Sequence, residues 1–522
     1  MLLKLNQKKI FPVLAIAMMG TLTVLPGCNH RSAQMATNDI DPFYLDPYRP
    51  QMHYSRDTAW LSDPNGLFYN DGVWHLMFQG IPNRAAWTQV GTSWDHATST
   101  DLLHWKYEPT VLQGDSMISY WSGGAVVDKG KVWAYYTNHF MGIYPETPDR
   151  NRICIATSED NGKTWTYNKD RIAVENKQFP SERDPSVFWH EPSKKWIMAT
   201  AGTGHIRFYS STNLADWKFE SETLPYPSWE CPSLATMKVE ETGEEKVLLI
   251  TSTNGGVANS SHGTCYHVGT FDGHEFHPED ASKTKHWMDW GSDFYAGLVF
   301  SNAPQNRVLF QSWFGWPCQI NKDLCRTSKF NGTMNLIREL SLHVDKQGNY
   351  YVASNPIDEY RQLRTDSVAL QSMALSGRKV VKEQVGSHEP LEIELDVTLD
   401  EGALFGIRLK NDFGEDYVFQ YDDWRHQFLG DRTNAGTVPG HLGNGYNRIS
   451  RMPYTAQNQH LKLRVYWDVS TFEVFVDDGR EAFSQLFYPR ESFSKIELFS
   501  FTGKTQVNEM KIYNLESIWK KQ

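Results

Sequence analysis

The sequence predicts an all-β protein in which a five-bladed β-propeller is followed by a C-terminal β-sandwich. Short β-rich runs such as "KVWAYYT", "KWIMATA" and "KVLLITST" alternate with Gly, Asn, Asp and Pro, and long stretches of helical periodicity are almost absent. One turn pattern recurs along the first half of the chain, which indicates repeated units. Later in the chain, apolar and polar residues alternate at the period of a strand. These observations favour two β domains in series.

The recurring pattern is a hydroxyl, an acid or amide, a turn and an aromatic residue. It occurs in "STDLLHW" (99–105), "SEDNGKTW" (158–165), "STNLADW" (211–217) and "TFDGHEF" (270–276), so successive aromatic residues lie 60, 52 and 59 positions apart. With the opening hairpin "GLFYNDGVWHLMFQ" as a further unit, five blades around an axis account for this spacing. A large β-sandwich with chance turns is the alternative.

Residues 1–27 are expected to be a signal peptide. Lys4, Lys8 and Lys9 precede an apolar run over residues 10–25, which is shorter than the roughly 20 residues of a spanning helix. The stretch "LPGC" (25–28) resembles the processing box of bacterial lipoproteins, which implies a lipid-modified Cys28 and a location in the bacterial cell envelope. An ordinary signal peptide is the alternative. Residues 28–48 are expected to be a flexible tether.

The propeller is expected over residues 49–353, a short linking helix over "SNPIDEYRQLR" (354–364), and the sandwich over residues 365–522. In "LEIELDVTL" (391–399) every second residue is apolar, and "LKLRVYWDVSTFEVFVDDG" (461–479) repeats this alternation before an Asp-Gly turn. Such segments are typical of half-buried antiparallel strands.

Composition limits the partners of the protein. The net charge of −11 argues against a nucleic-acid or anionic-membrane binder, so a neutral partner is expected, and membrane contact only through the lipid on Cys28. The other five cysteines are scattered, and no C-x-x-C pair or His cluster has metal-ligand spacing. We therefore expect no metal and no cofactor.

Three carboxyl groups from different parts of the predicted propeller are candidates for catalysis. They are Asp63 in "SDPNG", Asp184 in "SERDPSVFW" and Glu230 in "SWECPSL". The innermost strands of a propeller converge on its axis, so these acids could share one site. Paired carboxyl groups suit glycoside hydrolysis, because one attacks the anomeric carbon while the other protonates the leaving oxygen. The alternative is that each acid only caps a turn or forms a surface pair.

The surroundings of Asp63 and Glu230 should differ if one acid attacks the anomeric carbon and the other donates the proton. We expect the hydrogen-bond donors of its turn to keep Asp63 charged, and the neighbours Trp229 and Cys231 to keep Glu230 protonated by excluding water.

Six short motifs of the predicted propeller occur in a recognisable order. They are "WLSDPNG" (60–66), "WSGGAVV", "ERDPSV", "WECPSL", "DWGSDFYA" and "GTMNLIREL". In their order they resemble glycoside hydrolase family 32, the fructan hydrolases and invertases, whose signature W-M-N-D-P-N-G is similar to the first motif. "FEVFVDDGREAF" (472–483) is similar to a strand pair of the family's sandwich. The resemblance implies cleavage of β-linked fructofuranosyl units with retention of configuration.

Carried over residue by residue, the resemblance makes Asp63 the nucleophile, Glu230 the acid and then base, and Asp184 the acid that holds fructose hydroxyls. It also implies a set of sugar-contacting residues, namely Trp60, Ser62, Gln79, Trp87, Trp121, Ser122, Arg183 and Trp316. Ser62 replaces the usual Asn, "NRAAWTQVGTSWDHATS" (83–99) has two extra residues, and "FQSWFGW" (310–316) has one fewer. These departures bear on substrate choice more than on reaction type.

Two other functions compete with fructan hydrolysis. "SEDNGKTW" fits the Asp-box of sialidases, but sialidases also need an arginine triad and a tyrosine nucleophile and only this one box is complete, so a structural turn is the better explanation. A surface lipoprotein that binds fructans without cleaving them would need no proton donor, so the presence of all three acids argues against it. The leading hypothesis is a lipid-anchored hydrolase that acts on levan, inulin or their oligosaccharides, and on sucrose as a further candidate, outside the cytoplasm.

Overall fold

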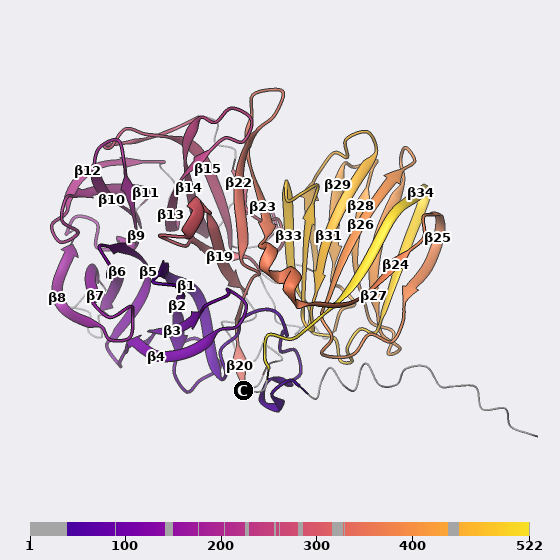
Figure 1. The fold of residues 1–522 in the computed structure, drawn as a ribbon, viewed down its shortest axis with the longest axis horizontal. Helices are drawn as coiled ribbons and strands as arrows, with labels where there is room; N and C mark the ends of the chain where they lie inside the picture. Colours follow the sequence, from indigo (N-terminus) through magenta and orange to yellow (C-terminus); the bar gives the residue numbers. More distant parts are fainter. Residues whose placement is uncertain are drawn as a thin grey trace, which may run out of the picture.

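The computed structural model describes residues 39–520, except 89, 141–149, 176, 203, 225–228, 255–256, 260–261, 280–284, 316–326, 328 and 437–447. Figure 1 shows five sheets arranged as a propeller on the left and a β-sandwich on the right. The predicted fold class is therefore confirmed. Cys28, the signal peptide expected over 1–27 and Trp316 lie outside the described residues.

Each blade is a four-stranded antiparallel meander whose first strand is innermost. The blades are β1 (Ala59–Asn70), β2 (Val73–Ile81), β3 (Ser93–Ser99) and β4 (Lys106–Leu112); β5 (Ile118–Asp128), β6 (Lys131–Phe140), β7 (Arg150–Ser158) and β8 (Thr166–Val174); β9 (Arg183–His190), β10 (Lys195–Gly202), β11 (His205–Ser211) and β12 (Lys218–Thr223); β13 (Trp229–Lys238), β14 (Glu245–Asn254), β15 (His262–Phe271) and β16 (Phe276–Pro278); and β18 (Tyr295–Val299), β19 (Leu309–Phe314), β22 (Arg338–Val344) and β23 (Tyr350–Pro356).

Short strands complete the propeller at three places. β20 (Phe330–Asn331) runs parallel to β1, β17 (His286–Trp287) pairs with β15, and β21 (Thr333–Met334) pairs with β19. A 3-10 helix, η2 (Pro304–Asn306), lies between β18 and β19. The innermost strands β1, β5, β9, β13 and β18 contact one another in a closed ring. This ring brings together residues that are far apart in the sequence.

The recurring turn pattern connects the third strand of a blade to the fourth in four of the five blades. Its hydroxyl accepts a backbone hydrogen bond in the first three copies, as Ser99 Oγ does from Leu102 N at 2.9 Å. Its acid or amide accepts another, as Asp160 Oδ1 does from Thr164 N at 2.9 Å. The repeat is thus a local device that reverses the chain at the outer edge of each blade.

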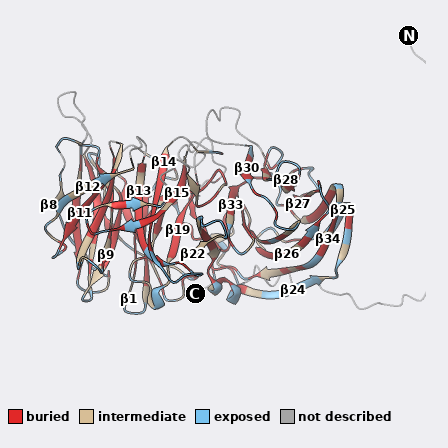
Figure 2. Ribbon diagram, turned by 90° about the horizontal axis from the view of Figure 1, so that it is seen from above, coloured by how far each residue is buried: buried red, intermediate tan, exposed pale blue. Residues whose placement is uncertain are grey.

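The sandwich is built around one long strand. Its elements are β24 (Arg364–Leu370), β25 (Met373–Lys382), β26 (Leu391–Leu399), β27 (Leu404–Lys410), β28 (Asp416–Asp422), β29 (Gln427–Asp431), β30 (Ile449–Pro453), β31 (His460–Trp467), β32 (Thr471–Val476), β33 (Glu481–Leu486) and β34 (Lys495–Leu515). β34 pairs with β27 along residues 495–501 and with β26 along residues 505–514, so both layers share it. The alternating apolar residues of β26 all face the common core, as the sequence predicted. In Figure 2 the buried strands are red, and the outer strand β24 is mostly exposed.

The segment before the propeller packs against the end of the chain. A 3-10 helix, η1 (Pro42–Tyr44), places Tyr44 on Trp519 with ring centroids 4.2 Å apart and nearly parallel. Ile40 is 5% exposed, and Asp41 N donates to Trp519 O. Residues 40–48, which we expected to belong to the tether, are therefore packed against the domain junction. The stacking of these apolar rings explains why they are ordered.

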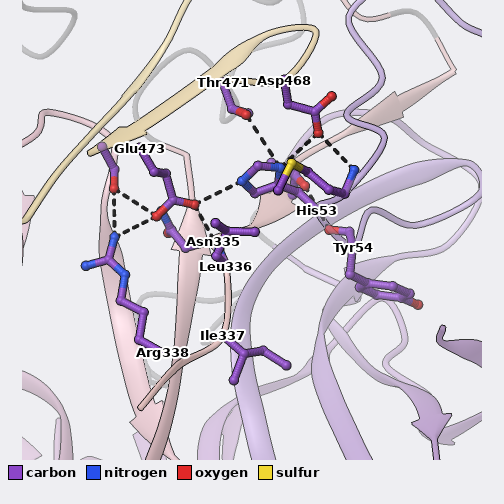
Figure 3. A network of polar contacts seen from close by, with 12 residues as sticks. His53, Tyr54, Asn335, Leu336, Ile337, Arg338, Asp468, Thr471 and Glu473 are labelled. Carbon is purple, nitrogen blue, oxygen red and sulfur yellow. Dashed lines mark hydrogen bonds and ion pairs between the residues drawn. The ribbon is translucent and has the colours of Figure 1, made fainter. Parts of the chain in front are cut away.

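The two domains meet at a buried network of charges. The linking helix is a 3-10 helix, η4 (Asp358–Leu363), and Figure 1 shows it between the propeller and the sandwich. In Figure 3 the ring of His53 lies between Asp468 and Glu473 of the sandwich, at 3.0 and 2.9 Å. Arg338 of the propeller reaches the other oxygen of Glu473 at 2.7 Å. These side chains are fully buried, so each charge depends on its partners.

Candidate active site

The candidate site lies where the five innermost strands begin. Asp63 is in β1, Asp184 is the second residue of β9, and Glu230 is the second residue of β13. The pairing of each innermost strand with its neighbour is interrupted beside these positions, with register shifts between Leu61 and Pro64 and between Glu230 and Ser233. Such a bulge turns side chains out of the normal alternation, here towards the axis.

Proline explains several of these interruptions. A proline follows each acid: Pro64 and Pro185 come directly after Asp63 and Asp184, and Pro232 comes two residues after Glu230. Proline has no N–H to donate to the hydrogen bonds between strands. Two residues also adopt left-handed backbone conformations, Asp184 with φ of 58° and Cys231 with φ of 45°. Backbones held in this region cost free energy and are concentrated at functional sites.

Asp63 is held by side chains from two neighbouring strands. Ser122 Oγ donates to Asp63 Oδ2 at 2.7 Å. Gln79 Nε2 donates to Ser122 Oγ at 2.8 Å and lies 3.5 Å from Asp63 Oδ2. Ser62 Oγ donates to Gln79 Oε1 at 3.4 Å. Four of the predicted site residues therefore form one connected group.

Asp184 is held by one hydrogen bond from its own backbone N–H and by another to its carboxylate. Its own N–H donates to Thr137 Oγ1 at 2.8 Å, and its Oδ2 accepts from Cys231 N at 3.1 Å. The thiol of Cys231 lies 3.8 Å from Asp184 Oδ2 and 3.9 Å from Asp63 Oδ2. Cys231 therefore sits between the two aspartates and defines their spacing.

Glu230 contacts two polar partners. Arg183 Nη2 donates to Glu230 Oε1 at 2.7 Å, and the Tyr295 hydroxyl donates to Glu230 Oε2. Arg183 Nε also lies 3.5 Å from Asp184 Oδ2, so one guanidinium contacts two of the three acids. The Glu230 side chain keeps 19% of its surface exposed. Its surroundings are thus more polar than the Trp and Cys neighbours in the sequence predicted, because the fold adds an arginine and a tyrosine.

The acids affect each other's charge. Burial raises the pKa of Asp63 to about 6; the hydrogen bond from Ser122 opposes this effect, and the charge of Glu230 adds to it. Burial likewise raises the pKa of Asp184 to about 7, against the lowering influence of Arg183. With a pKa of about 6, Asp63 is mostly charged at neutral pH, and its hydrogen bonds favour this form as we expected; burial nevertheless raises the pKa above that of an exposed aspartate.

The predicted aromatic contacts are distributed around this group. Trp60 is 2% exposed and packs edge-on against Trp313, with ring centroids 6.1 Å apart. Trp121 stacks on His139 at 3.7 Å. Trp87 lies in the loop between β2 and β3 and is 38% exposed. Among the predicted tryptophan contacts that the structure describes, Trp87 is the most exposed.

Sequence reasoning missed three residues of the site. Tyr295 lies inside the quoted motif "DWGSDFYA" but was given no role, and Cys231 was considered only as an apolar neighbour. Thr137 Oγ1 donates to Ser122 O at 2.9 Å and so connects the second blade to Asp184 in the third. The motif itself could have indicated Tyr295, whereas Thr137 lies in an ordinary strand sequence and gave no signal.

No group of three or more His, Cys, Asp or Glu side chains that could hold a metal ion is found among the described residues. The described part of the chain also contains no helix long and apolar enough to span a membrane.

Comparison with known proteins relates both domains to one family. The family model "Glycosyl hydrolases family 32 N-terminal domain" matches residues 53–355, and "Glycosyl hydrolases family 32 C terminal" matches residues 359–514. A levanase of Bacillus subtilis (strain 168) is 31% identical over 91% of this chain and 72% of the levanase. An extracellular exo-inulinase of Aspergillus awamori is 29% identical over 91% of this chain and 96% of the inulinase.

Solved structures show the same architecture. The crystal structure of exo-inulinase from Aspergillus awamori superposes with a TM-score of 0.80 and 28% identity, covering 91% of this chain and 100% of that one. The similarity therefore extends over both the propeller and the sandwich.

Proposed function

Because the chain belongs to glycosyl hydrolase family 32, we propose that its three clustered carboxyl groups divide the steps of cleaving a β-fructofuranosidic bond. The protein is a glycoside hydrolase that acts on β-fructofuranosides, and fructans are its substrate class. One observation carries the proposed roles: Cys231 Sγ lies between Asp63 and Asp184, Arg183 contacts Asp184 and Glu230, and yet Asp63 and Glu230 have different hydrogen-bond partners.

In the proposed mechanism Asp63 is the nucleophile and Glu230 is the acid and then the base. The Asp63 carboxylate attacks the anomeric C2 of a fructosyl unit while Glu230 donates a proton to the leaving glycosidic oxygen. A fructosyl ester forms as the bond from C2 to the leaving oxygen breaks. Glu230 then removes a proton from a water molecule that attacks C2, which releases the sugar and restores Asp63. Two displacements at C2 give net retention.

Asp184 and Arg183 are proposed to hold the fructosyl unit rather than to react with it. Asp184 is 5% exposed; its N–H donates to the Thr137 hydroxyl, and its carboxylate accepts from Cys231 N. A carboxyl group fixed in this way can accept hydrogen bonds from sugar hydroxyls in one orientation, which positions C2 for attack. When substrate enters, Arg183 would give up part of its hydrogen bonding to Glu230.

Two variants test the division of roles. Asp63→Asn should reduce turnover of levan, inulin and sucrose by at least about 10³-fold, because no ester can form. Glu230→Gln should slow natural fructans by about 10²–10⁴-fold but fructosyl fluoride far less, since fluoride leaves without a proton. Equal losses of Glu230→Gln on both substrates would contradict its role as the acid.

Location is a separate proposal. We propose that the mature protein is attached to the bacterial cell envelope through a lipid on Cys28, a proposal supported by "LPGC" and the lysines before the apolar run. In cells that express the full chain, Cys28→Ala should move the protein from the membrane fraction to the soluble fraction. Mass spectrometry of the mature N-terminal peptide should detect acyl groups in the unaltered protein. An unmodified N-terminus would contradict the proposal.

A further inference from the structure

An open cavity lies on the sandwich, in the domain that contains none of the three acids. Its volume is ≈ 380 Å³, and three turns contribute its lining residues, which are Glu401, Gly402, Asp423, Trp424, His426 and Gln459. The turns precede β27, β29 and β31. One aromatic ring and several polar side chains thus surround a space large enough for a sugar unit.

Asp423 ties the three turns together. It is 5% exposed, and its Oδ2 accepts from Gly402 N at 2.7 Å and from Gln459 Nε2 at 2.8 Å. Its Oδ1 lies 3.4 Å from the hydroxyl of Tyr421. A buried carboxylate with these donors holds the walls of the cavity in fixed positions. The cavity is therefore built into the fold and does not depend on one mobile loop.

Trp424 lies exposed on the turns that Asp423 connects. Its side chain is 73% exposed, more than any other large apolar side chain in the described part of the protein. Gly402 has φ of +73°, and a Cβ at this position would come within 2.3 Å of the indole Nε1. The absence of a side chain at Gly402 thus lets the indole lie against the turn. Trp424 lines the cavity, and most of its surface is open to water, so the ring is accessible to a ligand.

The lining favours a hydroxyl-rich ligand. An indole face offers apolar contact, while Glu401, His426 and Gln459 offer hydrogen-bond acceptors and donors around it. Sugars present an apolar C–H face and a rim of hydroxyls, which matches this combination. An apolar protein surface would leave these polar side chains without partners at a cost in free energy.

We propose that this cavity binds fructosyl units of the polymeric substrate away from the active site. The proposal rests on the fructan substrate of the proposed function. A second contact with the same chain raises the effective concentration of substrate at the propeller, so it should matter for long fructans and not for short ones.

The test compares Trp424→Ala with Phe413→Ala, a matched control that removes another exposed aromatic ring from the same domain. Phe413 is 48% exposed and lies in the turn between β27 and β28. Each change is made in the full chain carrying Asp63→Asn, and migration is measured in native gels that contain levan or inulin. Trp424→Ala should weaken retardation by about tenfold, as loss of a central aromatic contact does, whereas Phe413→Ala should not change it.

Activity assays in the otherwise unaltered enzyme complete the test. Trp424→Ala should keep its kcat/KM on a short fructo-oligosaccharide, which also shows that it folds, and should lose activity on dilute long-chain fructan. Gly402→Ala should reproduce the loss by displacing the indole. Equal retardation of the Trp424 and Phe413 variants, or unchanged activity of Trp424→Ala on dilute long-chain fructan, would overturn the proposal. Failure of the unaltered enzyme to release sugar from any fructan would instead refute the proposed function, whatever the gels show.

Discussion

Asp63 is subject to two opposing influences on its charge. Burial raises its pKa to about 6, while the hydrogen bond from Ser122 at 2.7 Å stabilises the charged carboxylate. A nucleophile must be deprotonated to attack, so kcat/KM should fall as pH drops through about 6. The acid limb of the pH profile thus reports the environment of one carboxyl group together with the acids coupled to it.

Ser122→Ala should move this acid limb to higher pH. The variant removes a donor that favours the charged form, and a hydrogen bond to a charged group is worth about 1.5–3 kcal/mol, so a shift of about one to two pH units is expected. The measurement is kcat/KM on sucrose or a short fructan between pH 4 and 9. Ser233→Ala is the control, because its hydroxyl accepts from Val299 N in the inner ring. An unchanged limb in Ser122→Ala would show that the hydroxyl does not set the charge.

At this scale the sequence predicted more of the chemistry than of the environment. Asp63 and Asp184 each precede a proline, and Glu230 lies two residues before one. A nearby proline therefore distinguishes all three acids in the sequence. The contact between Tyr295 and Glu230 joins residues separated by 65 positions. No local pattern contains such a contact, because it exists only when the inner strands close into a ring. The raised pKa of Asp63 depends on the same closure.

The inner strands combine regular pairing with local interruption. Along most of its length β13 pairs residue by residue with β14, but the register shifts between Glu230 and Ser233. Similar shifts occur between Trp121 and Gly123 and between Tyr295 and Leu298. The regular part holds the strand in its blade, and the bulge turns one side chain to the axis. The position of a residue along its strand therefore determines whether its side chain packs in the hydrophobic core of the propeller or points into the candidate active site.

The turn between β7 and β8 should serve folding alone. Asp160 accepts from the backbone N–H of Thr164 at 2.9 Å and from its hydroxyl at 2.6 Å. Asp160→Ala should lower the free energy of unfolding by about 1–2 kcal/mol through the loss of these hydrogen bonds, and should leave kcat/KM unchanged.

Chemical denaturation and fructan hydrolysis together check this expectation. Glu159→Ala is the control, because the Glu159 side chain is 74% exposed and forms only a surface pair with Lys131. A loss of activity in Asp160→Ala with stability intact would indicate that the Asp-box has a catalytic role.

At the scale of elements, such turns made the blades predictable. The added strands β17, β20 and β21 are only two residues long, so the sequence contains no periodic pattern that could predict them.

The whole molecule depends on the charged junction between its domains. Burial alone would lower the pKa of His53, but its hydrogen bonds to Asp468 and Glu473 and their charges raise it to about 9. Arg338 and His53 in turn hold the pKa of Glu473 down at about 2, against the effect of burial. The guanidinium of Arg338 also lies between the rings of Phe294 and Phe475. The junction is thus stable only while both cations keep their charges.

Stability should therefore decrease in mildly alkaline solution. A histidine whose pKa rises on folding from 6.5 to about 9 contributes its full stabilisation below pH 6.5 and loses it as pH rises through about 9. The difference corresponds to about 3 kcal/mol. Urea unfolding monitored by circular dichroism at pH 6, 7.5 and 9.5 should show this decline.

His53→Asn should remove this pH dependence and lower stability at pH 7 by about 3–5 kcal/mol, since two buried carboxylates lose their shared partner. His460→Gln is the matched control, because His460 pairs with Asp396 at 2.9 Å but is 36% exposed. Retention of the alkaline decline in His53→Asn would assign it to another group. The sequence placed these residues in two domains but gave no sign of their contact, which depends on how the domains dock.

The position of β34 has a consequence for how the protein is made. This strand lies in the middle of both layers of the sandwich and follows all the other described strands in the sequence. A ribosome synthesises the blades early, and they can begin to fold as they emerge. Both sheets of the sandwich remain incomplete until residues 495–515 have been translated. During that interval the unpaired edges of β26 and β27 are exposed to other chains, and secretion of an incomplete polypeptide would leave them open.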